Sequence, residues 1–257
     1  HWRKGEGIQS QSPRYHWRGR DIGGGLVTTF NEWAVVSENR LTRIDKDVSD
    51  EAAAMMGCAV TTALGLVNND ASLKLGQSIA VIGCGGVGMN VIQGAALVGG
   101  NPIIGVDLYA NTPSKRALVN SLGATHLFET IDEVRELVGG RGVDVVVETT
   151  GKVDLIEKAY DLTSQTGKTV LVGQMRWDQK AAIQTLPMHA GKTLLASDGG
   201  QTNPNIDIPR YLRLYKAGKL KLDALVTHRF PLNQVNEALD LIRQGQVGRC
   251  ILTMENT

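Results

Sequence analysis

The feature that most constrains the fold of this chain is a glycine-rich turn between an apolar run and a helical pattern. Residues 78–82 form the apolar run, the glycines follow with the spacing Gly83-x-Gly85-x-x-Gly88, and residues 88–99 have the periodicity of a helix. Glycines at these positions allow a tight turn, a close approach of phosphate to the backbone, and contact between helix and strand. The start of the helix presents N–H groups and the positive end of its dipole. We therefore predict that a dinucleotide pyrophosphate binds at this turn, which comprises Gly83, Gly85, Gly86, Val87 and Gly88.

An acidic residue follows the turn at the distance typical of nucleotide-binding folds. The second predicted strand, residues 103–107, ends at Asp107, about 20 residues beyond the turn. A carboxylate there would accept hydrogen bonds from the adenosine ribose hydroxyls. Lys115 and Arg116 open the next predicted helix and could contact an adenosine phosphate, but the Asp107 carboxylate would repel that phosphate. We therefore expect NAD as the cofactor in preference to NADP.

Strand-like and helical segments alternate after residue 76, which is typical of a parallel sheet covered by helices on both faces. The chain is therefore expected to adopt an α/β fold with a doubly wound parallel sheet of the Rossmann type. The predicted strands are 78–82, 103–107, 125–128, 143–147, 168–172 and 193–196, and the predicted helices between them are 88–99, 114–122, 131–138 and 153–163. Outside this region, residues 27–36 alternate like a partly exposed antiparallel strand, and 205–217 and 233–244 have the pattern of amphipathic helices.

Composition indicates a globular protein with a small-molecule ligand. The chain has 257 residues, a formal net charge of +1 and 42% hydrophobic residues, a balance that points to neither a nucleic acid nor a membrane partner. We find no run approaching the roughly 18 apolar residues of a membrane span and no leader-like segment after His1. Three widely separated cysteines, Cys58, Cys84 and Cys250, argue against disulfides and for a reducing compartment. The cytoplasm is the expected location.

Several segments together resemble one known family, the zinc-dependent medium-chain alcohol and polyol dehydrogenases. The resemblance covers nearly the whole chain and includes the spacing between Cys58 and the glycine turn. Its segments are 30–33 (Phe-Asn-Glu-Trp), 51–58, the glycine turn, 123–126, 226–230 and 248–252.

The resemblance implies roles for individual residues. Cys58 falls at the position of a catalytic zinc ligand, and Thr62 falls where a threonine contacts the nicotinamide. Val172 and Gly173 match backbone that borders the nicotinamide ring, and Arg249 matches a basic residue that reaches the pyrophosphate. From the residue type alone, Cys58 would be a small buried side chain in a helix rich in Ala and Met, and the matching segments around it favour the ligand role.

The resemblance also implies a division of the chain. Residues 1–58 correspond to a remnant of a β-barrel catalytic domain, residues 59–198 to the NAD-binding domain, and residues 199–257 to a return into the catalytic domain. Relatives pair the edge strand, here 193–196, across a two-fold axis, which implies a homodimer or homotetramer. An uncharged edge of this kind has nothing to block such pairing.

The sequence departs from the family at the metal site. Members of the family use a first cysteine and a Gly-His-Glu motif in the barrel, and neither occurs here. The histidines at 16, 126, 189 and 228 do not rebuild the motif, and we expect them to be solvated or packed in the core. A zinc site needs three or four donors, so we expect this chain alone to bind nucleotide without holding catalytic zinc.

These expectations combine into one function with two alternatives. The chain is expected to derive from an NAD-dependent alcohol dehydrogenase that transfers hydride between an alcohol and an aldehyde or ketone, with zinc in the intact enzyme. One alternative is a zinc-free quinone or enoyl reductase, against which Cys58 argues. The other is a non-catalytic nucleotide-binding module. The substrate is not indicated, although Met175, Arg176 and Trp177 follow the fifth predicted strand and could border its pocket.

Overall fold

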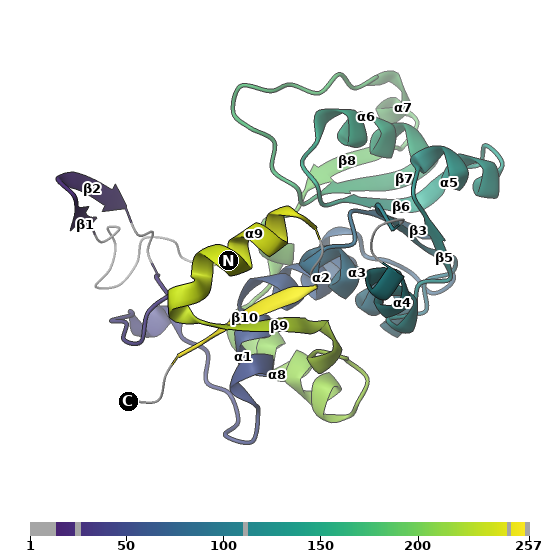
Figure 1. Ribbon diagram of the computed structural model, residues 1–257. Coiled ribbons are helices and arrows are strands. Elements are labelled where there is room, and N and C mark those ends of the chain that lie inside the picture. The colour runs from purple at the N-terminus through teal and green to yellow at the C-terminus, as the bar shows by residue number, and fades with distance from the viewer. Residues whose placement is uncertain (1–13, 24–26, 110–112, 246–247, 255–257) are drawn as a thin grey trace.

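Six parallel strands form the central sheet, in the order β5-β4-β3-β6-β7-β8 (Figure 1). The computed structural model describes residues 14–23, 27–109, 113–245 and 248–254. This strand order places β3 and β6 side by side at the centre, where the direction of winding reverses and where such folds bind ligands. The predicted doubly wound fold is therefore confirmed. The strands are β3 (Ile79–Ile82), β4 (Ile103–Val106), β5 (His126–Phe128), β6 (Val143–Glu148), β7 (Thr163–Leu171) and β8 (Thr193–Ala196).

The predicted strands all exist, and the largest difference in their bounds is at β7. Thr163 pairs with Val143 and Lys168 pairs with Val145, so residues 164–167 bulge out of register. The bulge brings residue 163 into the strand although its sequence neighbours resemble the end of a helix. The Thr163 hydroxyl lies 2.6 Å from that of Thr169 and 2.9 Å from the carbonyl of Ala159, which satisfies it within the core.

Helices cover both faces of the sheet. The α5 and α6 face has its own cluster, in which Ile131, Val134 and Leu162 pack against Ile82 and Val146. A capping box between Thr130 and Glu133 fixes the start of α5, as its sequence pattern favours. The helices of this region are α3 (Gly86–Leu97), α4 (Pro113–Ser121), α5 (Ile131–Val138), α6 (Val153–Leu162) and α7 (Leu186–His189).

A continuous helical run precedes the sheet and packs on its other face. It consists of α1 (Asp50–Met55), η2 (Met56–Val60), α2 (Thr61–Gly65) and η3 (Leu66–Asp70). By length and composition this run could cross a membrane, which corrects our expectation that no segment could. However, 67% of its apolar 18-residue stretch is buried inside the protein, as in the core helix of a globular domain.

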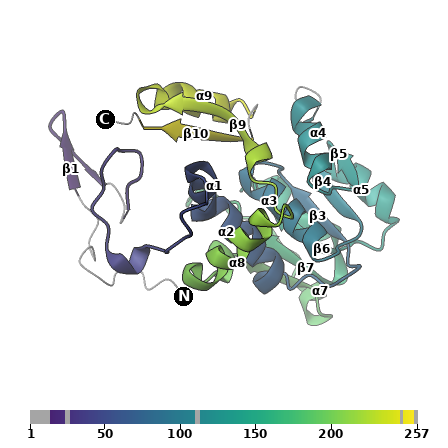
Figure 2. The same cartoon turned by 90° about the horizontal axis from the view of Figure 1, so that it is seen from below.

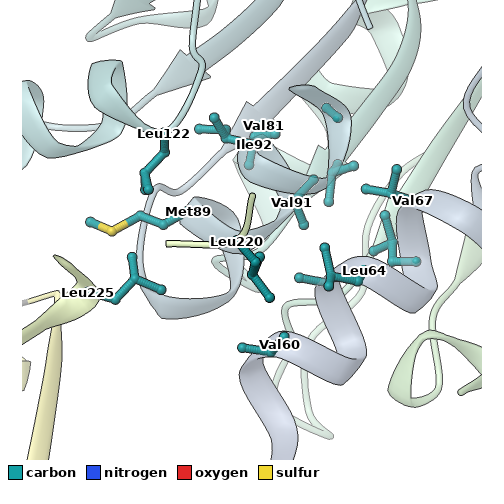
Figure 3. Close-up of a cluster of buried hydrophobic side chains, with 14 of the residues drawn as sticks. Val60, Leu64, Val67, Val81, Met89, Val91, Ile92, Leu122, Leu220 and Leu225 are labelled. Atoms are coloured by element: carbon teal, nitrogen blue, oxygen red, sulfur yellow. The ribbon is translucent and has the colours of Figure 1, made fainter. Parts of the chain in front are cut away.

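One hydrophobic cluster joins this run to the sheet and to the C-terminal segment (Figure 3). Gly94 of α3 makes the close approach possible, because a Cβ there would lie 3.0 Å from Leu64 and 3.2 Å from Val67. The predicted division of the chain after residues 58 and 198 stays a prediction. The hydrophobic cluster contains residues from both sides of each boundary. The cluster includes Val60, Leu64, Val67, Val81, Met89, Val91, Ile92, Leu220 and Leu225.

The C-terminal segment returns along the helical run and ends in a small sheet. Strands β9 (Val226–Pro231) and β10 (Arg249–Thr253) pair in parallel, and Figure 2 shows them beside α9. The two predicted amphipathic helices are present as α8 and α9. The remaining elements are η4 (Gly199–Gln201), α8 (Pro204–Lys216), η5 (Asp223–Leu225), η6 (Leu232–Gln234) and α9 (Val235–Arg243).

The predicted strand over 27–36 is wrong, because the structure assigns no strand within those residues. Instead, the side chain of Asn31 donates to the hydroxyl (3.2 Å) and carbonyl (3.4 Å) oxygens of Thr28, a local turn that competes with strand pairing. Trp33 and Val35 are each 85% exposed. The preceding residues form a hairpin of β1 (Arg14–Trp17) and β2 (Arg20–Gly23). The predicted barrel remnant stays a prediction.

Candidate functional site

The glycine turn forms a compact cradle with one open side. Gly83 has φ +89°, and a Cβ there would collide with Thr149, while a Cβ at Gly88 would collide with the carbonyl oxygen of Gly83. At Gly85, by contrast, no atom of the described residues lies within 4 Å of the place that a Cβ would occupy. The turn is therefore packed against the protein on both sides and open at Gly85, which suits the approach of a phosphate.

Arg249 reaches this cradle from β10. A Cβ at Gly86 would lie 2.5 Å from a guanidinium nitrogen of Arg249 and 2.6 Å from its Cδ. Gly85 is the N-cap of α3, and no side chain in the described part of the chain caps that end. The Arg249 guanidinium therefore lies beside the N-terminus of α3, and a cation next to a helix N-terminus suits a bound anion.

Asp107 follows β4 and contacts the glycine turn directly. Its Oδ2 accepts from the backbone N–H of Cys84 at 2.7 Å and from the Lys115 ammonium at 2.6 Å. Its Oδ1 accepts from the N–H of Leu108 at 2.7 Å. The side chains of Asp107 and Lys115 are 17% and 10% exposed, so the ion pair is largely shielded from water. From the sequence, Lys115 could be a phosphate contact or a solvated residue at the start of a helix, and neither reading predicts its pairing with Asp107.

A buried carboxylate organises the end of β6, opposite the glycine turn. Glu148 has no exposed surface and accepts from the N–H groups of Thr150 at 2.7 Å and Gly151 at 3.0 Å, as well as from the Thr150 hydroxyl. The Thr149 hydroxyl lies 2.8 Å from the carbonyl oxygen of Gly83. Residues 148–151 thus support the glycine turn from the neighbouring strand. From the sequence, Glu148 only closes a predicted strand, because an acidic residue after an apolar run usually marks a strand end and gives no sign of these contacts.

The residues predicted to border the nicotinamide lie at the end of β7. The N–H groups of Val172 and Gly173 donate to the carbonyl oxygen of Glu148 at 2.8 and 3.1 Å. A Cβ at Gly173 would collide with Gly151. The carboxyl ends of β6 and β7 are therefore in contact, at the edge of the sheet that carries the glycine turn.

Cys58 and Thr62 lie in the helical run before the sheet. Cys58 is exposed within η2, and Thr62 is buried in α2. Segments of π-helix such as η2 often occur at functional sites. Among the described residues, no group of three or more His, Cys, Asp and Glu side chains could hold a metal ion. These residues therefore do not form a complete zinc site.

A hollow of about 580 Å³ lies beside this edge of the sheet, between the start of α6 and the segment after β7. Arg176 lines it and pairs with Asp178 at 3.2 Å, and its place beside a substrate stays a prediction. Met175 does not line the hollow, and the Trp177 side chain is fully exposed. Its other lining residues include Thr150, Lys152, Glu157 and Gln174.

A doubly wound parallel sheet with a glycine turn at its reversal point defines the class of dinucleotide-binding α/β proteins. The family model described as "Zinc-binding dehydrogenase" matches residues 86–217, which is about half of the chain. The chain therefore belongs to the zinc-binding dehydrogenase family.

Several relatives of the chain are named alcohol dehydrogenases. The chain is 34% identical to the NDMA-dependent alcohol dehydrogenase of Amycolatopsis methanolica over 93% of this chain and 66% of that protein. It is 31% identical to alcohol dehydrogenase 1 of Trifolium repens over 98% of this chain and 68% of that protein. The structure of benzyl alcohol dehydrogenase from Acinetobacter calcoaceticus superposes with a TM-score of 0.79 at 28% identity, covering 85% of this chain and 61% of that chain. The chain thus spans about two thirds of the length of these relatives, or slightly less.

Proposed function

We propose that this chain contains the nucleotide-binding part of an NAD(H)-dependent alcohol dehydrogenase. The observation that carries the proposal is the convergence of Arg249 and the N-terminus of α3 on the glycine turn, with Asp107 held beside it. Proteins named alcohol dehydrogenases match most of the chain, which supports hydride transfer between an alcohol and an aldehyde or ketone. A small alcohol or carbonyl compound is the proposed substrate.

The residues of the site have distinct proposed tasks. The N–H groups of the turn and Arg249 bind the pyrophosphate, and Asp107 accepts from the adenosine ribose hydroxyls. Val172 and Gly173 border the nicotinamide, which Thr62 contacts from the helical run. When bound, NAD supplies the hydride acceptor, and these residues hold its two halves in a fixed orientation.

Zinc does not enter this proposal as a reacting group. The described residues provide Cys58 as a candidate ligand but no set of three donors, so they do not fit a complete site. The ligand role of Cys58 in an intact enzyme depends on donors outside the described residues.

A substitution at Gly85 tests nucleotide binding without disturbing the fold. A methyl group at Gly85 meets no described atom within 4 Å, so Gly85→Ala should fold normally but occupy the space where the phosphate approaches. We expect at least about a tenfold loss of NADH affinity by calorimetry, or about 1.4 kcal/mol. Gly23→Ala, which also has no neighbour within 4 Å, is the matched control. Equal NADH affinity in both variants would refute the proposed pyrophosphate site.

A second candidate function is nucleotide binding without turnover, and the incomplete donor set among the described residues favours it. NADH absorbance assays with alcohols, aldehydes, quinones and enoyl compounds distinguish the candidates. Turnover of alcohols supports the dehydrogenase, and turnover of quinones or enoyl compounds alone supports a reductase of the same family. Tight NADH binding with no turnover of any of them supports the non-catalytic module.

A further inference from the structure

Residue 84 of the glycine turn is held at two points by the segment that follows β4. The Asp107 carboxylate accepts from the Cys84 backbone N–H at 2.7 Å. Two residues further on, the Tyr109 hydroxyl donates to the Cys84 Sγ at 3.1 Å. The contact of Asp107 belongs to the proposed nucleotide site. The contact of Tyr109 lies directly beside that site.

Tyr109 and Cys84 meet inside the protein rather than at its surface. Tyr109 is 2% exposed and Cys84 has no exposed surface. The absence of a side chain at Gly105 makes room for them, because a Cβ there would lie 3.0 Å from the Tyr109 hydroxyl and 3.1 Å from the Cys84 sulfur. Burial raises the pKa of the Cys84 thiol to about 12, so the thiol stays protonated and neutral at physiological pH.

The Tyr109 ring also contacts the start of α4. The Arg116 guanidinium carbon lies 5.5 Å from the ring centroid, within the range of a cation–π contact. Its neighbour in sequence, Lys115, pairs with Asp107. Tyr109 is therefore connected both to the turn and to the helix that supplies the partner of Asp107.

We propose that Tyr109 is a positioning residue of the nucleotide site: its hydroxyl anchors the segment after β4 to the glycine turn through Cys84. The anchor fixes the spacing between the turn that binds pyrophosphate and the carboxylate that binds the adenosine ribose. A site held in its binding geometry before the ligand arrives loses less conformational entropy on binding. This inference rests on the proposed nucleotide-binding function and deepens it.

The affinity for ADP-ribose measures the positioning role of Tyr109, because this ligand contains both the pyrophosphate and the adenosine ribose. We expect Tyr109→Phe to weaken ADP-ribose binding roughly 3- to 10-fold in calorimetry, the range for one neutral hydrogen bond. Cys84→Ala should weaken it similarly, and the double variant should be no weaker than either single one. Cys84→Ser, which keeps an acceptor, should restore most of the affinity.

The chain offers a matched control in Tyr160→Phe. Tyr160 is 1% exposed, and its hydroxyl donates to the Gln184 carbonyl oxygen at 2.8 Å, so the variant loses a comparable buried hydrogen bond in α6. It should lower stability without changing the ADP-ribose affinity. A merely structural role for Tyr109 would give Tyr109→Phe the same result, and that outcome would overturn the proposal.

A measurement without ligand separates the anchor from nucleotide binding. In a chain carrying Cys58→Ser and Cys250→Ser, Cys84 is the remaining thiol, and iodoacetamide can reach it only when the segment opens. Tyr109→Phe should increase the alkylation rate several-fold, and an unchanged rate would refute the anchor. If the unsubstituted chain failed to bind ADP-ribose, the proposed function would fail and the positioning role with it, even if alkylation had demonstrated the anchor.

Discussion

The Asp107 carboxylate has a structural task and a proposed ligand-binding task. It holds the backbone of Cys84 and carries the Lys115 ammonium within 2.6 Å, yet its proposed role needs free acceptor capacity for ribose hydroxyls. A carboxylate has about four lone-pair sites, and three are engaged by the contacts described. The fourth site leaves room for one ribose hydroxyl. The adjacent Lys115 ammonium weakens the repulsion between the carboxylate and the additional adenosine phosphate of NADP.

We predict a preference for NADH over NADPH that depends on Asp107. Asp107→Ala should narrow the ratio of the two dissociation constants, because the carboxylate that accepts from a ribose hydroxyl and repels phosphate is removed. Thermal shifts with each nucleotide measure it, since ligand at a hundred times its dissociation constant stabilises a protein by about 2.7 kcal/mol. Asp132→Ala, which breaks an exposed pair with Arg135, is the control. An unchanged ratio in Asp107→Ala would remove Asp107 from this role.

Lys115 gives the complementary prediction. Lys115→Met keeps much of the side-chain length but removes the charge, which leaves the Asp107 carboxylate uncompensated. The preference for NADH over NADPH should therefore widen, because the repulsion of the extra phosphate is no longer softened. Dissociation constants for both nucleotides, measured by fluorescence, check this. A narrower preference would mean that Lys115 supports NADH binding more than it offsets the repulsion of phosphate.

Among the elements, α3 and the helical run Asp50–Asp70 depend on each other. Gly94 lies where the two approach, with Leu64 and Val67 at 3.0 and 3.2 Å from the position of a Cβ. The run carries Thr62 and Cys58, and α3 begins at the glycine turn. Their contact therefore sets how the proposed nicotinamide residue sits relative to the pyrophosphate site.

A larger residue at Gly94 should separate these two helices. We expect Gly94→Val to destabilise the protein by about 1–3 kcal/mol through overpacking, measured by urea unfolding. Gly57→Ala, where no described atom lies within 4 Å of the added methyl group, should leave stability unchanged or slightly higher. Equal stability of the two variants would contradict the close packing of α3 on α2.

The elements also show what could be predicted from the sequence. Strands such as β3 and β6 were predictable because each is a short apolar run bounded by glycine or a charge, a local signal. Residues 27–36 carry a similar local signal but lack a paired neighbour among the described residues, and alternation cannot reveal that. The roles of Tyr109 and Glu148 were not predictable either, because each depends on which strand lies beside which.

The whole molecule has an exposed sheet edge at β8. Its residues Thr193–Ala196 are uncharged and pair on one side with β7, so the other side can pair with a second copy. We predict a homodimer through this edge. Leu195 is partly buried against the core, so a lysine there could also destabilise the fold. Thr193 is exposed, and Thr193→Lys is therefore the better test. Sedimentation should show dimers that Thr193→Lys weakens, and monomers alone at micromolar concentration would contradict the prediction.

Metal content is also a property of the whole chain. We predict that the purified chain holds less than one zinc per molecule and oxidises alcohols negligibly, while binding NADH, because one cysteine cannot hold zinc in a closed site. Elemental analysis alongside the NADH assay measures both. One zinc per chain, lost in Cys58→Ser together with turnover, would show that further residues of this chain complete the site.

The position of Arg249 has a consequence for how the protein is made. The glycine turn is synthesised before β10, which carries the cation that faces it. A ribosome-bound chain can therefore complete the six-stranded sheet while its anion site still lacks the Arg249 guanidinium. Nucleotide captured at that stage would be held weakly, so tight binding reports that synthesis has passed residue 249.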